Sequence, residues 1–79
     1  MQKLNSKIKS LVENFLKNNE VVLKEKAKKI NIKNKKDLWD LTSEAISEIY
    51  EELDSLAEYA EEWWDAQNMI AEWIIKNAK

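Results

Sequence analysis

The chain of 79 residues contains no glycine, proline, cysteine or histidine. Because tight β-turns usually need glycine, Asn-Gly or proline, the composition favours helices joined by short polar loops. The lack of cysteine and histidine excludes disulfides and zinc sites of the usual kind, and removes the commonest general base and the thiol nucleophile. Without glycine no phosphate-binding loop of the glycine-rich type can form. We therefore expect one all-α domain over residues 1–79 that is not an enzyme and carries no cofactor or metal.

Arginine is absent too, so all 13 basic residues are lysines. Lysine, asparagine and isoleucine have AT-rich codons, which indicates an AT-rich gene of the kind found in low-GC bacteria, some archaea, and their phages and plasmids. No apolar run has the length of a signal peptide or a membrane span, since Lys7 and Glu13 interrupt the one between Leu4 and Leu16. We expect a soluble protein in the cytoplasm of a cell or an infected host, with no membrane partner.

Two short helices are predicted in the first half of the chain. Over residues 2–17, apolar side chains recur at the helical spacings i, i+4, i+7 and i+8, at Leu4, Ile8, Leu11, Val12, Phe15 and Leu16. A weaker pattern covers residues 20–30, and residues 31–34 form a connector. The two helices could also be one bent helix. Asparagine tolerates left-handed backbone best among the residues present, so we expect helix ends at residues 18–19, 31–34 and 77.

One long helix is predicted from Lys35 to Asn77, because nothing in this segment breaks a helix. Asn34 followed by Asp37 resembles a capping box at its start. A continuous helix of this length would extend about 60 Å, too long for a compact monomer. Either it breaks near Asp54-Ser55 or Gln67-Asn68, giving a four-helix bundle, or it protrudes and pairs with a second copy.

A heptad register over this segment favours pairing, because it does not slip at either candidate break. Its a and d positions form a coiled-coil-like seam that we expect in a homo-oligomer, at Ile46, Ile49, Leu53, Leu56, Ala60, Trp63, Gln67, Ile70 and Ile74. The polar Gln67 at an a position either sets the register or marks a helix break. The two short lysine-rich helices are expected to pack on this long helix.

Charge is divided between the two halves of the chain. Residues 1–36 hold 11 Lys and 3 Glu, a balance of +8, whereas residues 37–79 hold 2 Lys and 12 acidic residues, a balance of −10. Such asymmetry is typical of surfaces for nucleic acid or for a charged partner. A simpler interpretation is that the basic helices flank the acidic helix and the two neutralise each other.

The basic half offers a nucleic-acid surface as an alternative function. Seven of the thirteen residues from 24 to 36 are lysines, namely Lys24, Lys26, Lys28, Lys29, Lys33, Lys35 and Lys36. Clustering of this kind is what attraction to phosphates requires. The absence of arginine, the commonest base-reading side chain, argues against sequence-specific recognition.

The acidic half offers a surface for a protein partner, which we take as the leading hypothesis. Carboxylates recur every seven residues at heptad position f, at Asp37, Glu44, Glu51, Glu58, Asp65 and Glu72, and predict a continuous acidic ridge. Such a ridge could dock into a basic groove of a nucleic-acid-handling protein, as small acidic inhibitors encoded by phages and other mobile elements do. The same ridge could also serve solubility alone.

Four tryptophans lie in this acidic half, and most are expected to fill the core or the seam. Trp63 and Trp64 are adjacent and point about 100° apart, so one of them is free to anchor a partner. The predicted function is therefore regulation or inhibition of a protein partner by an acidic, aromatic helix. The predicted contact residues are Glu51, Glu58, Tyr59, Glu62, Trp64, Asp65, Glu72 and Trp73.

Overall fold

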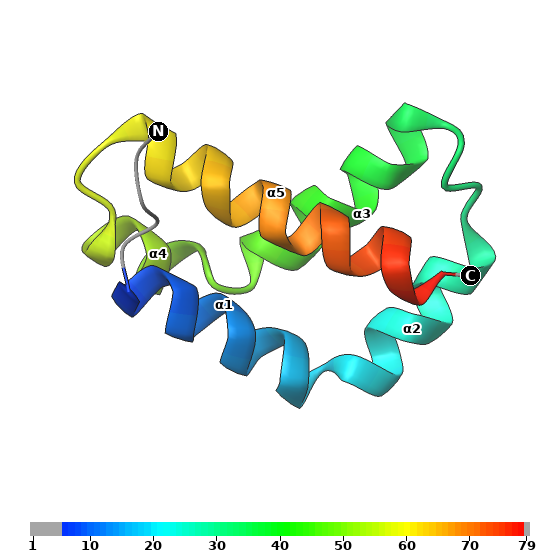
Figure 1. Cartoon of the computed structure of the whole chain (residues 1–79), viewed down its shortest axis with the longest axis horizontal. Coiled ribbons are helices and arrows are strands. Elements are labelled where there is room, and N and C mark those ends of the chain that lie inside the picture. The colour runs from blue at the N-terminus through cyan, green and yellow to red at the C-terminus, as the bar shows by residue number, and fades with distance from the viewer. Residues whose placement is uncertain (1–5, 79) are drawn as a thin grey trace.

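The computed structural model describes residues 6–78, which form five α-helices and no strand (Figure 1). The helices are α1 (Ser6–Asn18), α2 (Glu20–Lys29), α3 (Lys35–Ser47), α4 (Tyr50–Leu56) and α5 (Ala60–Asn77). The all-helical class is confirmed, as are two helices before the connector at residues 31–34. Residues 2–5 of the predicted first helix lie outside the described residues.

The chain bends at Asn19, the single residue between α1 and α2. Helical hydrogen bonding continues on both sides of the bend, because the Asn19 N–H donates to the Phe15 carbonyl and the Leu23 N–H donates to the Asn19 carbonyl, at 3.0 and 2.9 Å. The Asn19 backbone itself, at φ −115° and ψ 17°, has left the helical region. The alternative of one bent helix therefore describes this segment well.

Helix ends do fall at the predicted asparagines, but the reason expected for them is wrong. No residue of the described part has a positive φ, so none of these ends uses left-handed backbone. Asn19 and Asn77 instead donate a side-chain N–H to the carbonyl four residues earlier, at 2.9 and 2.8 Å. Asn34 caps α3 by accepting from the backbone N–H groups of Lys36 and Asp37. A short polar side chain thus replaces the glycine that usually ends a helix.

The single helix predicted from Lys35 to Asn77 is wrong, since this segment contains α3, α4 and α5. The first interruption lies at Glu48 and Ile49, whose N–H groups donate to carbonyls three residues earlier, at 3.2 and 3.1 Å. Such tightened turns need neither glycine nor proline. Ile49 is buried there and then accepts the first hydrogen bond of α4, from the Leu53 N–H at 2.9 Å.

The second interruption covers residues 57–59, between α4 and α5. Ala57 and Tyr59 both have extended backbone, with ψ angles of 128° and 152°. This break lies close to Asp54-Ser55, one of the two predicted positions. The other, Gln67-Asn68, lies inside α5, which continues through it without interruption.

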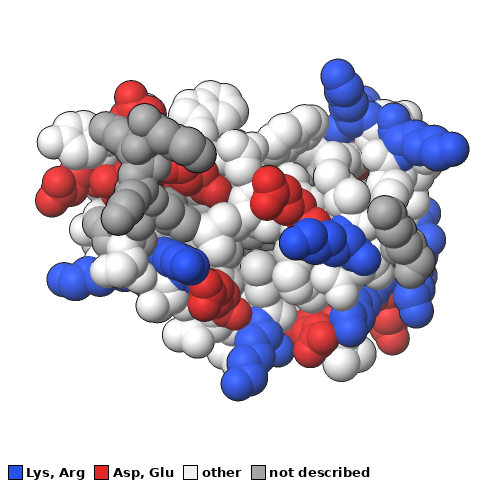
Figure 2. Space-filling model, in the orientation of Figure 1, with Lys and Arg blue, Asp and Glu red and all other residues white. Residues whose placement is uncertain are grey.

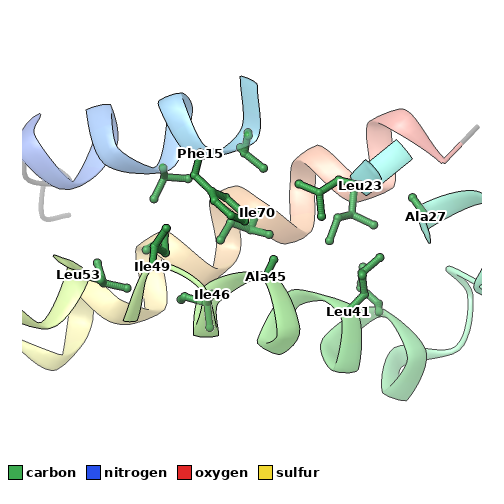
Figure 3. Packing of buried hydrophobic residues seen from close by; sticks show 14 of the residues in the cluster. Phe15, Leu23, Ala27, Leu41, Ala45, Ile46, Ile49, Leu53 and Ile70 are labelled. Atoms are coloured by element: carbon green, nitrogen blue, oxygen red, sulfur yellow. The ribbon is translucent and has the colours of Figure 1, made fainter. Parts of the chain in front are cut away.

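The two breaks let the acidic half fold back on itself, so that α5 runs back across α3 and also contacts α1 and α2 (Figure 1). The longest dimension of the molecule is 34 Å, about half the length of the unbroken helix. Figure 3 shows Ile70 of α5 between Phe15 of α1 and Ala45 of α3. Ile70 and Ile74 are fully buried, and each such side chain stabilises the fold by about 1.5–3 kcal/mol. The free energy gained by burying the apolar side of α5 exceeds the free energy of the few helical hydrogen bonds lost at the two breaks.

Candidate functional site

Positive and negative side chains lie towards opposite ends of the molecule. Figure 2 shows most of the visible lysines towards the end that holds α2 and the connector, and a group of carboxylates at the end where α4 meets α5, with charges of both signs between them. We call the second end the acidic corner. It comprises α4, residues 57–59 and the first turns of α5, with the carboxylates Glu51, Glu52, Asp54, Glu58, Glu61, Glu62 and Asp65.

A ring contact and a backbone hydrogen bond hold the acidic corner together. The rings of Tyr50 and Trp63 lie 5.0 Å apart between centroids, and this contact joins the start of α4 to the start of α5. The Glu58 N–H donates to the Glu62 carboxylate at 3.3 Å, which supports the turn into α5. Glutamate three residues into a helix serves the same purpose in a capping box. The corner is therefore a defined turn and not a loose loop.

Two aromatic rings of the acidic corner face solvent. The exposed fraction is 61% for Trp64 and 58% for Tyr59, although large aromatic side chains usually bury most of their surface. Among residues 6–78, none of the seven corner carboxylates forms an ion pair. The corner thus combines unpaired negative charge with exposed aromatic surface.

The structure brings together six of the eight predicted partner-contact residues. Glu51, Glu58, Tyr59, Glu62, Trp64 and Asp65 all belong to the acidic corner. The other two, Glu72 and Trp73, lie about two turns farther along α5, some 12 Å away. Trp73 is half-buried and lines a different groove, of about 310 Å³, together with Glu13, Leu16, Lys17 and Glu20.

The continuous acidic ridge predicted at position f does not exist, because the two breaks distribute its residues over separate elements. Asp37 and Glu44 lie on α3, Glu51 on α4 and Glu58 in the turn after it, while Asp65 and Glu72 lie on α5. Heptad spacing places side chains in a line only while one helix continues. Of this series only Glu51, Glu58 and Asp65 lie in the acidic corner.

The residues of the predicted oligomer seam lie mostly inside the single chain. Ile46, Ile49, Leu53, Ile70 and Ile74 are buried in its hydrophobic core. Leu56, Trp63 and Gln67 are half-buried, and Ala60 is exposed. Folding back of the acidic half therefore gives these apolar side chains partners within the same chain, and a second copy would need another surface.

The predicted nucleic-acid residues lie along α2, the connector and the start of α3. Lys24 and Lys26 are half-buried, whereas Lys28, Lys29, Lys33, Lys35 and Lys36 are exposed. Three members of this set are paired: Lys24 with Glu20, Lys36 with Asp40, and Lys26 with Glu44, at 2.9, 3.1 and 2.7 Å.

Mutual neutralisation of the two halves is limited to two ion pairs in the described part of the chain, Lys26–Glu44 and Lys36–Asp40. Of its ion pairs, only Lys26–Glu44 joins two helices, α2 and α3, and it borders an open groove of about 410 Å³. The hydrogen bond that the Lys26 ammonium donates to the Glu44 carboxylate raises the pKa of Lys26. Four lysines, Lys28, Lys29, Lys33 and Lys35, have no ion pair with any residue from 6 to 78.

None of the four tryptophans is fully buried. Trp63 and Trp73 are half-buried and pack against the core, whose buried apolar residues are aliphatic side chains and Phe15. Trp39 is 38% exposed on α3.

Sequence reasoning also missed three features of the surface: the exposed Tyr50, the carboxylates Glu52, Asp54 and Glu61 of the corner, and the exposed Val21 and Val22 on α2. The charge runs at residues 51–54 and 58–62 were the available signal for the corner, once the helix is allowed to break between them. Val21 and Val22 lie in residues 20–30, where the apolar pattern is weak. The sequence there does not indicate which apolar side chains face solvent.

No group of three or more acidic side chains among residues 6–78 is close enough to hold a metal ion. None of the helices in this range combines the length and apolarity needed to cross a bilayer. No protein-family model, curated protein or solved structure matches the chain.

Proposed function

We propose that this protein is a non-enzymatic regulator or inhibitor that binds a basic protein partner through the acidic corner. The observation that carries the proposal is the exposure of Trp64 and Tyr59 beside seven carboxylates that have no cationic partner in the described structure. Composition supports a binding role over a catalytic one, because histidine and cysteine are absent.

The aromatic rings would supply the affinity of such a contact. Tryptophan and tyrosine are enriched among the residues that dominate binding energy, and they act best where partner groups exclude water around them. Trp64 projects from α5 next to the turn at residues 57–59, where a partner can reach it from outside the helical core.

The carboxylates would orient the partner protein and raise the rate at which it associates. Clustered charges of one sign create a potential that attracts an oppositely charged surface and speeds its association at low salt. Lysine and arginine side chains on the partner can also lie over the exposed rings as cation–π contacts. A basic surface with room for two aromatic rings is therefore the expected complement, as in a nucleic-acid-handling protein.

Affinity capture from a host lysate, followed by titration of the purified captured protein, tests the proposal. We expect a basic protein to be captured, and Trp64→Ala to weaken its binding by at least about tenfold, the loss typical of an interface anchor. Trp39→Ala is the matched control, because Trp39 is also exposed but lies on α3 outside the corner. Equal affinity of the Trp64→Ala variant and the unmodified protein for the captured partner would refute a role for the corner.

A second candidate function is non-specific binding of nucleic acid by the lysine cluster at residues 24–36. It is favoured by the four lysines that lack an ion pair and by their concentration at one end of the molecule (Figure 2). A gel-shift titration at several salt concentrations tests it, since binding through phosphate contacts weakens steeply with salt. Tight, salt-sensitive binding that is lost in Lys33→Glu with Lys35→Glu would favour this function over the protein partner.

A further inference from the structure

The exposed side of α2 carries apolar and basic side chains together. Val21 and Val22 are 71% and 52% exposed, the largest exposed fractions among the large aliphatic residues of the described chain. Lys28 and Lys29 follow them by seven residues, so each valine and its lysine project in nearly the same direction. The exposed Glu25 lies on the same side, four residues after Val21 and four before Lys29, so these three charged residues leave a net charge of +1. Both lysines are exposed and neither has an ion pair among the described residues. We call this surface the basic face.

The basic face complements the acidic corner in charge and in apolar character. The corner presents Tyr59 and Trp64 among carboxylates that pair with no cation of residues 6–78, and the basic face presents two valines beside one carboxylate and two lysines that likewise lack an ion pair in this range. Contact between them would pair the charges and remove apolar surface from water at the same time.

The two surfaces cannot meet within one molecule. The corner and α2 lie at opposite ends of the chain's longest dimension, 34 Å, and α5 runs between them (Figures 1 and 2). The seam predicted from the heptad pattern is occupied by the chain's own core. The corner of one molecule can therefore contact the basic face only of another molecule.

We infer that the acidic corner binds the basic face of a second copy of this chain, in head-to-tail association. This inference rests on the proposed role of the corner as a binding surface and names one partner for it. The contact joins two different surfaces, so each bound copy leaves a free corner and a free basic face, and association continues with concentration unless a ring closes. Occupation of the corner by a second copy would compete with the basic partner protein.

Sedimentation velocity across a range of protein and salt concentrations tests the inference. We expect species larger than the 9.4 kDa monomer at low salt, growing with concentration and dissociating as salt screens the charges. Asp54→Lys with Glu58→Lys lowers the summed charge of the seven-carboxylate corner from −7 to −3, and Lys28→Glu with Lys29→Glu makes the basic face acidic. Each variant alone should associate at least about tenfold more weakly, because the first loses more than half of the corner's negative charge and the second places like charges against each other. Mixing the two variants should restore association.

A matched control distinguishes the effect of changing the basic face from the effect of changing the net charge of the protein. Lys9→Glu with Lys17→Glu makes the same charge change on α1, and this variant should associate as the unmodified protein does. Circular dichroism of every variant confirms that it is folded. A monomer at all concentrations and salts, or association that both charge inversions leave unchanged, would overturn the inference. Capture of a basic protein through Trp64 by a strictly monomeric chain would overturn head-to-tail association while supporting the proposed function.

Discussion

The ring of Tyr50 lies against the ring of Trp63, with centroids 5.0 Å apart and planes inclined at 51°. This is the only ring pair in the described part of the chain, and it joins α4 to α5 across the turn at residues 57–59. Tilted aromatic pairs of this kind contribute about 0.5–1.5 kcal/mol beyond the area they bury. The pair therefore helps to hold the acidic corner in its bent form.

A double-mutant cycle measures this contact. We expect Tyr50→Ala and Trp63→Ala each to lower the free energy of unfolding, and the double variant to lose about 0.5–1.5 kcal/mol less than the sum of the single losses. Urea denaturation followed by circular dichroism gives the three values. Losses that add within about 0.3 kcal/mol would show that the two rings are not energetically coupled.

Ile70 is the residue of α5 on which the folded-back arrangement depends most. It is fully buried between α1 and α3, so Ile70→Ala should lower the free energy of unfolding by about 2–5 kcal/mol. The total free energy of unfolding of a small domain is only about 5–15 kcal/mol, so Ile70→Ala could unfold the chain. Ile70→Val is a milder variant, with an expected loss of about 0.5–1.5 kcal/mol in the free energy of unfolding. Ile75→Ala, on the partly exposed side of the same helix, is the control and should cost clearly less. Equal losses at positions 70 and 75 would contradict the packing of α5.

Asn34 determines where α3 begins, because its side-chain oxygen accepts hydrogen bonds from the N–H groups of Lys36 and Asp37, at 2.9 and 3.4 Å. Asn34→Ala removes this acceptor and should lower the free energy of unfolding by about 0.5–2 kcal/mol. Asn34→Asp keeps an acceptor of the same length and should retain most of the stability. Thermal denaturation of the three proteins checks this, and an alanine variant as stable as the aspartate variant would argue against the cap.

The Lys26–Glu44 pair predicts a specific dependence of stability on pH. The hydrogen bond between them raises the pKa of Lys26 in the folded chain above the ordinary value of 10.5. Stability from a raised pKa is fully present below the ordinary value and is lost as pH rises through the raised one. The difference in Tm between the unmodified protein and Lys26→Met should therefore be constant below the ordinary pKa of 10.5 and shrink as the pH rises above it. Lys33→Met is the control, and a Lys26→Met difference that stays constant above this pKa would contradict the pairing.

Much of the local structure was predictable from local signals. The spacing of Ile8, Val12 and Phe15 indicated the buried side of α1, and all three are buried in the structure. The connector at residues 31–34 and the cap at Asn34 were recognisable because their chemistry involves residues adjacent in sequence. Only half of the predicted capping box forms, however, since the Asn34 N–H donates to the Asn31 carbonyl at 2.9 Å.

The helical class and the divided charge were readable from the sequence, because they follow from composition and from spacing along one helix. That residues 35–77 form three helices depends on tertiary contacts. The turns at Glu48-Ile49 and at residues 57–59 contain no glycine or proline, and only the second lies near a break that the sequence suggested, at Asp54-Ser55. They exist because folding back buries Ile70 and Ile74 against distant helices, a gain larger than the hydrogen bonds given up. The same reversal collected the carboxylates into a corner and left Trp64 exposed beside them.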